Sequence, residues 1–236
     1  MPANRLLAAL PDAVRLRALS DCRLVELKFA QVLAQPGEPA RHAYFPLDSL
    51  ISIVTTLEGG ARLEVGIVGD EGMLGTGLVL GISAWPQHAV VQGAGSALRM
   101  GGSALARHCK QDESVQRRLQ RYIYVVMAQL AQTAACTHFH NVDARLARWL
   151  LMTRDRAHTD EFRLTQEFLA YMLGVRRVGV THAAISLQER GLIHYSRGVI
   201  AILDGKGLEK VSCRCYLQGK RLYERTLGSA AQRAAV

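Results

Sequence analysis

Residues 164–193 read LTQEFLAYMLGVRRVGVTHAAISLQERGLI, and this stretch decides the fold. Thr165 is a favourable N-cap residue, and apolar side chains follow it at helical spacing. Gly174 stands where this first helix has to stop in a tight turn. A second helix begins shortly after it and ends at Gly191. Two short helices joined by a glycine turn are typical of a helix-turn-helix.

Two strand-like runs follow the helix pair directly, at residues 192–195 and 199–203. They are separated by Ser196-Arg197-Gly198, a sequence that favours a tight turn. A hairpin in this position is a wing. The whole stretch therefore predicts a winged helix-turn-helix, which indicates binding to double-stranded DNA more specifically than the helix pair alone does.

The N-terminal end of the second helix carries the side chains that we expect to contact DNA. An α-helix fits the major groove, and an arginine at its N-terminal end can donate two hydrogen bonds to guanine. Arg176 and Arg177 oppose the helix dipole there, which indicates an external anionic partner; the alternative is a solvated helix end. The start of the first helix and the tip of the wing are placed to grip phosphates. The predicted DNA contacts are Arg176, Arg177, Val178, Thr181, His182, Thr165, Gln166, Ser196 and Arg197.

The composition agrees with a polyanionic partner. The 236 residues include 29 Lys and Arg against 20 Asp and Glu, a formal charge of +9, and residues 138–236 alone hold 16 basic and 9 acidic side chains. A hydrophobic content of 49% is enough for a buried core. No apolar run approaches the roughly 18 residues of a membrane span and no signal-peptide pattern opens the chain, so we expect a cytoplasmic protein without a membrane partner. The five cysteines are odd in number and irregularly spaced, and we expect them to be reduced.

The part of the chain before residue 102 is typical of β-structure. Short runs rich in Val, Ile and Leu alternate with turn signals, which favours a sandwich or barrel. Together with the helical second half, this predicts an α+β fold. The expected strands are 24–29, 49–56, 62–68 and 89–100, and the expected helices outside the helix-turn-helix are 1–19, 112–136, 142–156 and 207–216.

The predicted helix 112–136 contains neither Gly nor Pro and carries an apolar stripe at steps of four, three, four and four residues. That spacing is close to the a/d pattern of a helix that pairs with a copy of itself. The alternative is a helix packed against its own β-domain. The predicted dimerisation residues are Val115, Leu119, Tyr122, Val126 and Leu130.

A β-rich domain, a long helix and a winged helix-turn-helix together resemble the Crp/Fnr (cyclic-AMP receptor protein / fumarate–nitrate regulator) family of bacterial transcription regulators. The likeness is strongest over residues 164–204, where LTQEFLAYMLGVRR is similar to the family's DNA-binding signature. The resemblance implies a cyclic-nucleotide-binding-like sensory β-roll at residues 1–110, a dimerisation helix at 111–137 and a DNA-binding domain at 138–236. It also implies a homodimer on a palindromic operator, RNA polymerase as a partner and a small-molecule effector.

The sensory domain departs from the family's cyclic-AMP pattern. Gly72-Met73-Leu74-Gly75 looks like the family's phosphate cassette, with Met73 in place of the ribose-binding glutamate. Gln87 and His88 stand where the phosphate-binding Arg-Ser pair is expected, and a buried cyclic phosphate without an arginine lacks its charge partner. We therefore expect that cyclic AMP is not bound in the usual way; cyclic di-GMP, another small molecule or no effector at all are the alternatives. The effector-pocket candidates are Gly72, Met73, Gly75, Gln87 and His88.

Cys136-Thr-His138-Phe-His140 puts a thiol and two imidazoles within five residues, a set able to ligate a metal or haem. We interpret it as a hinge with packing or capping histidines, because zinc needs a further ligand and no partner cluster is evident in the sequence. Cys213-Arg-Cys215 has a poor chelate spacing and is expected to pack under the C-terminal helix.

An enzyme is the competing class of function. The β-rich part holds only His42 and His88, with Glu64 and Glu71 too scattered to indicate a metal site. The sequence also has no Walker loop and no Ser/His/Asp order. We therefore predict no catalytic residue, no metal and no cofactor.

Overall fold

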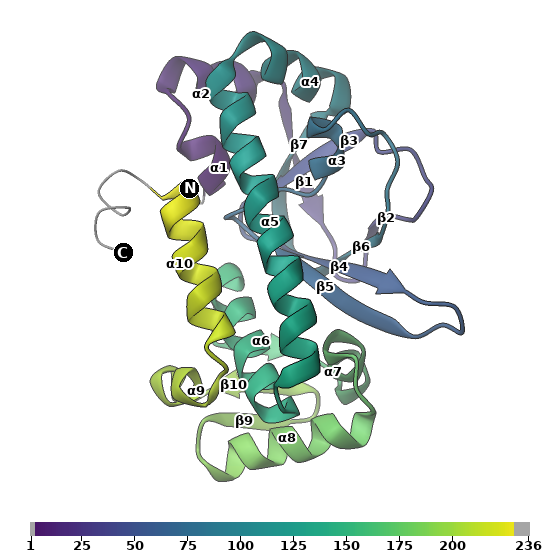
Figure 1. Ribbon diagram of the computed structural model, residues 1–236, viewed down its shortest axis with the longest axis vertical. Helices are drawn as coiled ribbons and strands as arrows, with labels where there is room; N and C mark the ends of the chain where they lie inside the picture. The colour runs from purple at the N-terminus through teal and green to yellow at the C-terminus, as the bar shows by residue number, and fades with distance from the viewer. Residues whose placement is uncertain (1–2, 229–236) are drawn as a thin grey trace. The chain divides into compact units, whose positions relative to one another are not determined.

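The computed structural model describes residues 3–228, and the chain forms two compact units (Figure 1). Unit 1 comprises residues 1–54, 66–128 and 222–236, and unit 2 comprises residues 55–65 and 129–221. Met1 and Pro2, with which the predicted helix 1–19 begins, lie outside the described residues. Among residues 3–228, no helix has both the length and the apolar character needed to cross a membrane.

Unit 1 is built on two antiparallel sheets, with strand orders β1–β7–β3 and β2–β6–β4–β5. This confirms the predicted β-structure of short strands. The strands are β1 (Cys22–Leu27), β2 (Val32–Ala34), β3 (His42–Pro46), β4 (Leu50–Thr56), β5 (Arg62–Val68), β6 (His88–Gly93) and β7 (Gly95–Gly101). The helices that accompany them are α1 (Arg5–Ala8), α2 (Asp12–Ser20), α3 (Thr76–Val79), α4 (Gly102–Gln111) and the first part of α5 (Glu113–Phe139).

The first half of α5 lies beside the β1–β7–β3 sheet, as Figure 1 shows, and completes the core of unit 1. Val115, Leu119 and Tyr122 are only 3–4% exposed and share this core with Phe45 of β3. An apolar sheet face has to be covered, and this side of α5 covers it. These three members of the predicted dimerisation stripe therefore lie in the chain's own core. This is the alternative in which the helix packs against its own β-domain.

The last two members of the stripe differ from the first three. Val126 is half-buried and packs against the same core, whereas Leu130 is 38% exposed. The predicted stripe as a whole is therefore not the solvent-exposed face of α5.

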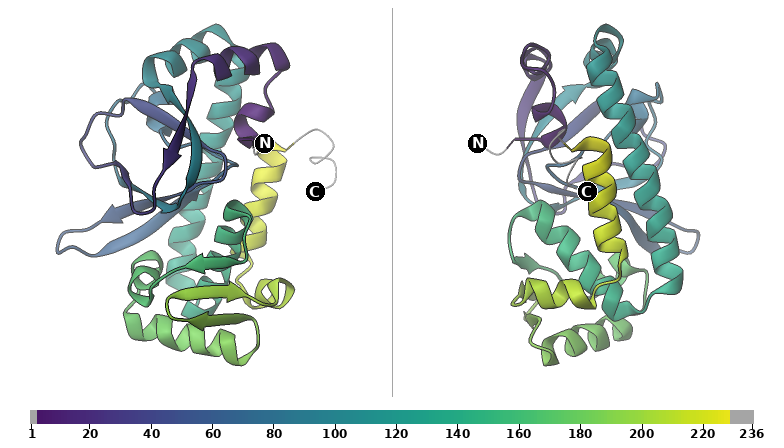
Figure 2. Two further views of the ribbon diagram at one scale, coloured as in Figure 1. Left: turned by 180° about the vertical axis from the view of Figure 1, so that it is seen from behind. Right: turned by 60° about the vertical axis from the view of Figure 1, so that its left-hand side comes forward.

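Unit 2 contains the winged helix-turn-helix that the sequence predicts. Figure 2 shows its helices beside a small antiparallel sheet of order β8–β10–β9. Strand β8, which is not predicted from the sequence, pairs with the second strand of the wing. The elements of unit 2, besides the end of α5, are α6 (Val142–Ala157), β8 (Glu161–Arg163), α7 (Gln166–Leu173), α8 (Arg177–Glu189), β9 (Ile193–Ser196), β10 (Val199–Ile202), α9 (Gly205–Val211) and the start of α10 (Cys215–Leu227).

Three predicted elements are each divided in two. The helix expected at 1–19 is α1 followed by α2, because Pro11 lacks a backbone N–H and begins the second helix instead of continuing the first. The strand expected at 89–100 is β6 followed by β7. The helix expected at 207–216 is α9 followed by α10, because the extended backbone of Ser212 ends α9.

A buried hydrogen bond fastens β5 to α6 within unit 2. The indole Nε1 of Trp149 donates to Oε1 of Glu64 over 2.6 Å, and both residues are 6% exposed. A hydrogen bond to a carboxylate is stronger than one between neutral groups, and low local polarity strengthens it further. Glu64, which is too isolated in the sequence to indicate a metal site, is a structural acceptor here.

We expect Trp149→Phe to destabilise unit 2 by about 1.5–3 kcal/mol, because it removes a hydrogen bond to a buried charged acceptor while keeping most of the ring. Urea denaturation followed by circular dichroism measures this loss. Glu64→Gln, which keeps an acceptor oxygen for the indole, is expected to cost less. A loss from Glu64→Gln as large as that from Trp149→Phe would contradict the assignment of Glu64 as a hydrogen-bond acceptor that a neutral amide oxygen can replace.

Candidate nucleic-acid interface

The turn between α7 and α8 is built from three local features. The Thr165 hydroxyl accepts a hydrogen bond from the backbone N–H of Phe168 at 3.1 Å, so the predicted N-cap is confirmed. Gly174 ends α7 in the left-handed conformation at φ +60°, which a residue with a Cβ adopts only at a cost. The buried guanidinium of Arg145 on α6 donates to the carbonyl of Leu173, one of the orphan acceptors at the end of α7.

Helix α8 then presents its N-terminal end to solvent. Arg176 occupies the N-cap position, and its side chain makes no capping hydrogen bond within the part of the chain described. Arg177, Val178 and His182 are exposed, with Val178 at 63%. The opposite side of α8 is buried against α6 and α7. An uncapped helix N-terminus that carries two arginines combines backbone donors, dipole and formal charge, and it is suited to an anionic partner.

Gln166, the first residue of α7, links the two helices at this surface. Its Oε1 accepts hydrogen bonds from Arg177 Nε at 3.3 Å and from Thr181 Oγ1 at 3.1 Å. The Thr181 hydroxyl is also 3.1 Å from the carbonyl of Arg177. The structure thus brings together three of the residues predicted from the sequence, and it gives Arg177 a defined direction before any ligand arrives.

The wing turns at Arg197 and Gly198, both in the left-handed region at φ 50° and 77°. Ser196 pairs with Val199 across this two-residue loop, and consecutive left-handed residues are the signature of a type I′ hairpin turn. Ser196 and Arg197 are exposed at the tip. Tyr195 anchors the hairpin, since its hydroxyl donates to the carbonyl of Leu164 just before α7.

Ile185, which is not among the predicted contacts, is 50% exposed on α8. It lies seven residues after Val178 and therefore on the same side of the helix. Both are large apolar side chains left in solvent at the surface that carries Arg177. The sequence signal for Ile185 is the helical period of 3.6 residues: apolar side chains that recur on the polar face of the helix stand out there, as those on the buried face do not.

The effector-pocket candidates are divided between core and surface. Met73 is 2% exposed and belongs to the core of unit 1. A Cβ at Gly72 would collide with the hydroxyl of Tyr122, and Gly75 adopts φ +105° beside Ala43. Gln87 and His88, in contrast, are only half-buried, with His88 opening β6.

Four of the Cys and His residues in the sequence motifs converge in unit 2. Sγ of Cys136, Cys213 and Cys215 and a ring nitrogen of His140 all lie within 4.8 Å of one another. The expectation that Cys136 and His140 have no partner cluster is therefore wrong, because α9 and α10 return Cys213 and Cys215 to the end of α5. His138 is exposed, and its ring lies against Phe139.

Hydrogen bonds within this cluster change the acidity of two of its thiols in opposite directions. A hydrogen bond from the Cys213 thiol, with help from His140 and Arg148, holds the pKa of Cys136 well below its usual range. The hydrogen bond to Cys136 and burial raise the pKa of Cys213. Of the two close thiols, Cys136 is therefore the one that loses its proton more readily.

Comparisons with known proteins agree with this geometry. A family model described as a Crp-like helix-turn-helix domain matches residues 144–211. A search against curated proteins gives no match.

Several solved structures share the fold. FixK2 from Bradyrhizobium japonicum superposes with a TM-score of 0.68 at 16% identity, covering 81% of this chain and 98% of its own. TTHB099, a Crp-family transcriptional regulator from Thermus thermophilus, superposes with a TM-score of 0.67 at 20% identity. The match covers 80% of this chain and 96% of TTHB099. CLP, a c-di-GMP-responsive global regulator from Xanthomonas campestris, superposes with a TM-score of 0.67 at 16% identity. The match covers 82% of this chain and 100% of CLP. The chain thus carries a Crp-like helix-turn-helix domain at residues 144–211, in a fold that it shares with solved regulators of the Crp family.

Proposed function

We propose that the chain is a homodimeric transcription regulator, and not an enzyme, that recognises a specific palindromic DNA sequence through the N-terminal end of α8. The observation that carries this proposal is the exposed pair Arg176 and Arg177, of which Arg177 is held in position by Gln166. A guanidinium that is already oriented loses less conformational entropy when it binds a base edge.

The other side chains of this surface complete the proposed reading. Arg177 donates to guanine O6 and N7, while Val178 and Ile185 contact thymine methyl groups. His182 donates to a base edge or a phosphate, and Arg197 at the wing tip contacts a phosphate and sets the register without reading sequence. Thr165 contributes through the helix N-terminus that it caps, because its hydroxyl is engaged with Phe168.

Homodimerisation is assigned to the free face of α5. Tyr124 and Met127 are 58% and 64% exposed, and Ala131 and Ala134 continue their line in solvent. The steps of three, four and three residues give an a/d seam, and the small alanines allow a second copy of the helix to approach closely. This seam replaces the predicted stripe, whose first three residues lie in the core of unit 1.

We further propose that unit 1 does not bind cyclic AMP in the usual way. A ligand placed over Gly72 has to displace the side chain of Tyr122, and Met73 points into the core. Both observations support a regulator that responds to a different molecule or to none.

Arg177→Ala is expected to weaken binding to the preferred DNA sequence by about 1–3 kcal/mol, because one bidentate base contact is lost. Binding to a scrambled duplex should change far less. The preferred sequence comes from selection on random DNA, and both affinities are then titrated at one salt concentration, since phosphate contacts make binding salt-dependent. Arg190→Ala, at the other end of α8, is the matched control.

Arg197→Asn distinguishes a phosphate contact that positions the protein on DNA from a base contact that reads the sequence. Asparagine tolerates the left-handed turn, so the wing is kept while one cation is removed. Specific and non-specific affinity should then fall by similar factors, with the slope of log affinity against log salt reduced by about 1. If Arg177→Ala gave the same pattern as Arg197→Asn, the assignment of Arg177 to base reading would fail.

Met127→Glu is expected to convert a dimer into a monomer, because two carboxylates would be forced into one apolar seam. Sedimentation equilibrium measures the mass directly. Gln111→Glu adds the same charge on the exposed side of α4 and should leave the dimer intact. A Met127→Glu protein that still sediments as a dimer would place the interface elsewhere.

Calorimetric titration tests the sensory domain. We expect no saturable heat with cyclic AMP, since the cassette-like segment lacks both the arginine and the free space that a cyclic phosphate needs. Saturable binding of cyclic AMP would overturn this part of the proposal. Cyclic di-GMP is titrated in parallel: binding would identify that ligand, and its absence would favour another effector or none.

A further inference from the structure

We propose that Cys136, His140, Cys213 and Cys215 form a tetrahedral zinc site that joins the end of α5 to the junction of α9 and α10. This site is separate from the proposed DNA-binding surface and does not depend on it. It gives a common role to two sequence motifs that the regulatory function leaves unused.

Each half of the site is placed by local structure. Cys136 and His140 are four residues apart, and the backbone N–H of His140 donates to the carbonyl of Cys136, so both side chains lie on one face of the last helical turn. Cys213 lies in the break after α9, and Cys215 is the first residue of α10. The positive end of a helix dipole favours a thiolate at Cys215.

Two of the distances between ligand atoms match the edges of one metal tetrahedron, and all four atoms lie within 4.8 Å of one another. With Zn–S near 2.3 Å and Zn–N near 2.0 Å, the edges of a tetrahedron are about 3.8 Å between two sulfurs and about 3.5 Å between sulfur and nitrogen. Sγ of Cys136 and Cys213 are 3.5 Å apart, and Sγ of Cys215 is 3.6 Å from Nδ1 of His140. An iron–sulfur cluster, which has several irons, needs its ligands farther apart. Three thiolates and one imidazole converging on one point are a ligand set typical of structural zinc.

The surroundings of the cluster favour thiolates over neutral thiols. Gln132 Nε2 donates to Sγ of Cys215 at 3.0 Å, the kind of outer-shell hydrogen bond that steadies a metal-bound thiolate. Arg145 and Arg148 of α6 are more than nine-tenths buried, and both interact electrostatically with Cys136. Cysteines that served only as small apolar residues would not gather an amide donor and two buried cations.

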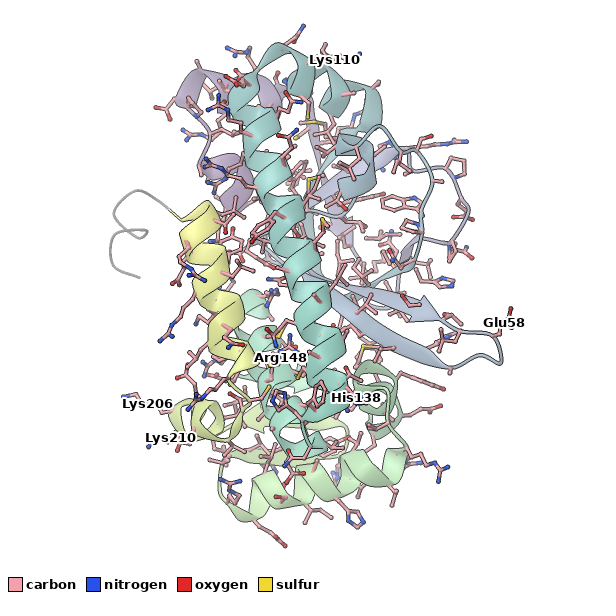
Figure 3. The ribbon with its side chains drawn as sticks, viewed as in Figure 1. Glu58, Lys110, His138, Arg148, Lys206 and Lys210 are labelled. Carbon is pink, nitrogen blue, oxygen red and sulfur yellow. The ribbon has the colours of Figure 1, made fainter. Side chains whose placement is uncertain are left out.

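Charge balance points the same way. Zinc with three thiolates and a neutral imidazole carries a net charge of −1, which the guanidinium of Arg148 (labelled in Figure 3) opposes from α6. Buried arginines are stable only beside compensating charge or acceptors. The metal-bound cluster supplies a fixed negative charge that does not depend on which thiol is ionised.

Metal analysis of the full-length protein, purified under reducing conditions without chelator, is the first test. We expect one zinc per chain, and native mass spectrometry should show the same mass increment. Cobalt(II) substituted for zinc should give the charge-transfer and d–d bands of a tetrahedral thiolate complex. Protein that is folded by circular dichroism but neither contains zinc nor gives these bands would overturn the proposal.

His140→Gln and His138→Gln form a matched pair, because both histidines are exposed and only one belongs to the cluster. Loss of an outer-shell partner lowers metal affinity by about 10–100-fold. His140→Gln removes a ligand and should lower the zinc affinity, measured by competition with a chelator, by more than this. His138→Gln should have no effect. Equal effects of the two substitutions would overturn the site.

The cysteines are tested in the same way. Cys213→Ser is expected to weaken the cobalt charge-transfer band, because one of three thiolates is lost, whereas Cys22→Ser and Cys109→Ser, both in unit 1, should retain it in full. Mass spectrometry of alkylated, metal-free protein distinguishes the competing chemistry. A Cys136–Cys213 disulfide in protein that never takes up zinc would show that the close thiols are a redox pair instead of a metal site.

Discussion

A buried arginine on α6 is the constraint on which unit 2 depends. The guanidinium of Arg145 donates to the carbonyl of Leu173, at the C-terminal end of α7. A carbonyl at a helix end that is buried without a partner costs free energy, and a cation is the donor that the negative end of the helix dipole favours. Because Gly174 follows immediately and turns the chain, this hydrogen bond also fixes where α8 begins. The orientation of Arg176 and Arg177 toward solvent is a consequence of it.

The features that the sequence predicts well are local ones. The cap at Thr165, the left-handed turn at Gly174 and the wing hinge at Arg197 and Gly198 each depend on residues within four positions of one another. Their side chains and backbone dihedrals satisfy one another regardless of the rest of the chain. For the same reason Gln166, which begins the helix after that cap, is placed correctly, although its hydrogen bonds to Arg177 and Thr181 were not foreseen.

The sequence predicts poorly which element packs against a given apolar face. The periodicity of α5 identifies an apolar face but not its partner, and the face that contains Leu119 is occupied by unit 1's own sheet. A helix with a second apolar line, through Tyr124 and Met127, can be buried on both sides only if a further partner exists. The convergence of Cys136 with Cys213 is hidden for the same reason: 77 residues separate them, and the path of α9 and α10 brings them together.

The basic composition of the C-terminal part needs to be divided according to burial. Arg176, Arg177 and Arg197 are exposed, and their charge is available to phosphates and guanines. Arg145, Arg148 and Arg156 of α6 are more than nine-tenths buried, so their charge serves the interior. A cation in the interior requires acceptors or anions in contact with it, and here these include the end of α7 and the thiols beside Cys136. A count of lysines and arginines therefore overstates the charge that this domain offers to DNA, and the buried share explains why a cluster able to hold a negative charge lies against α6.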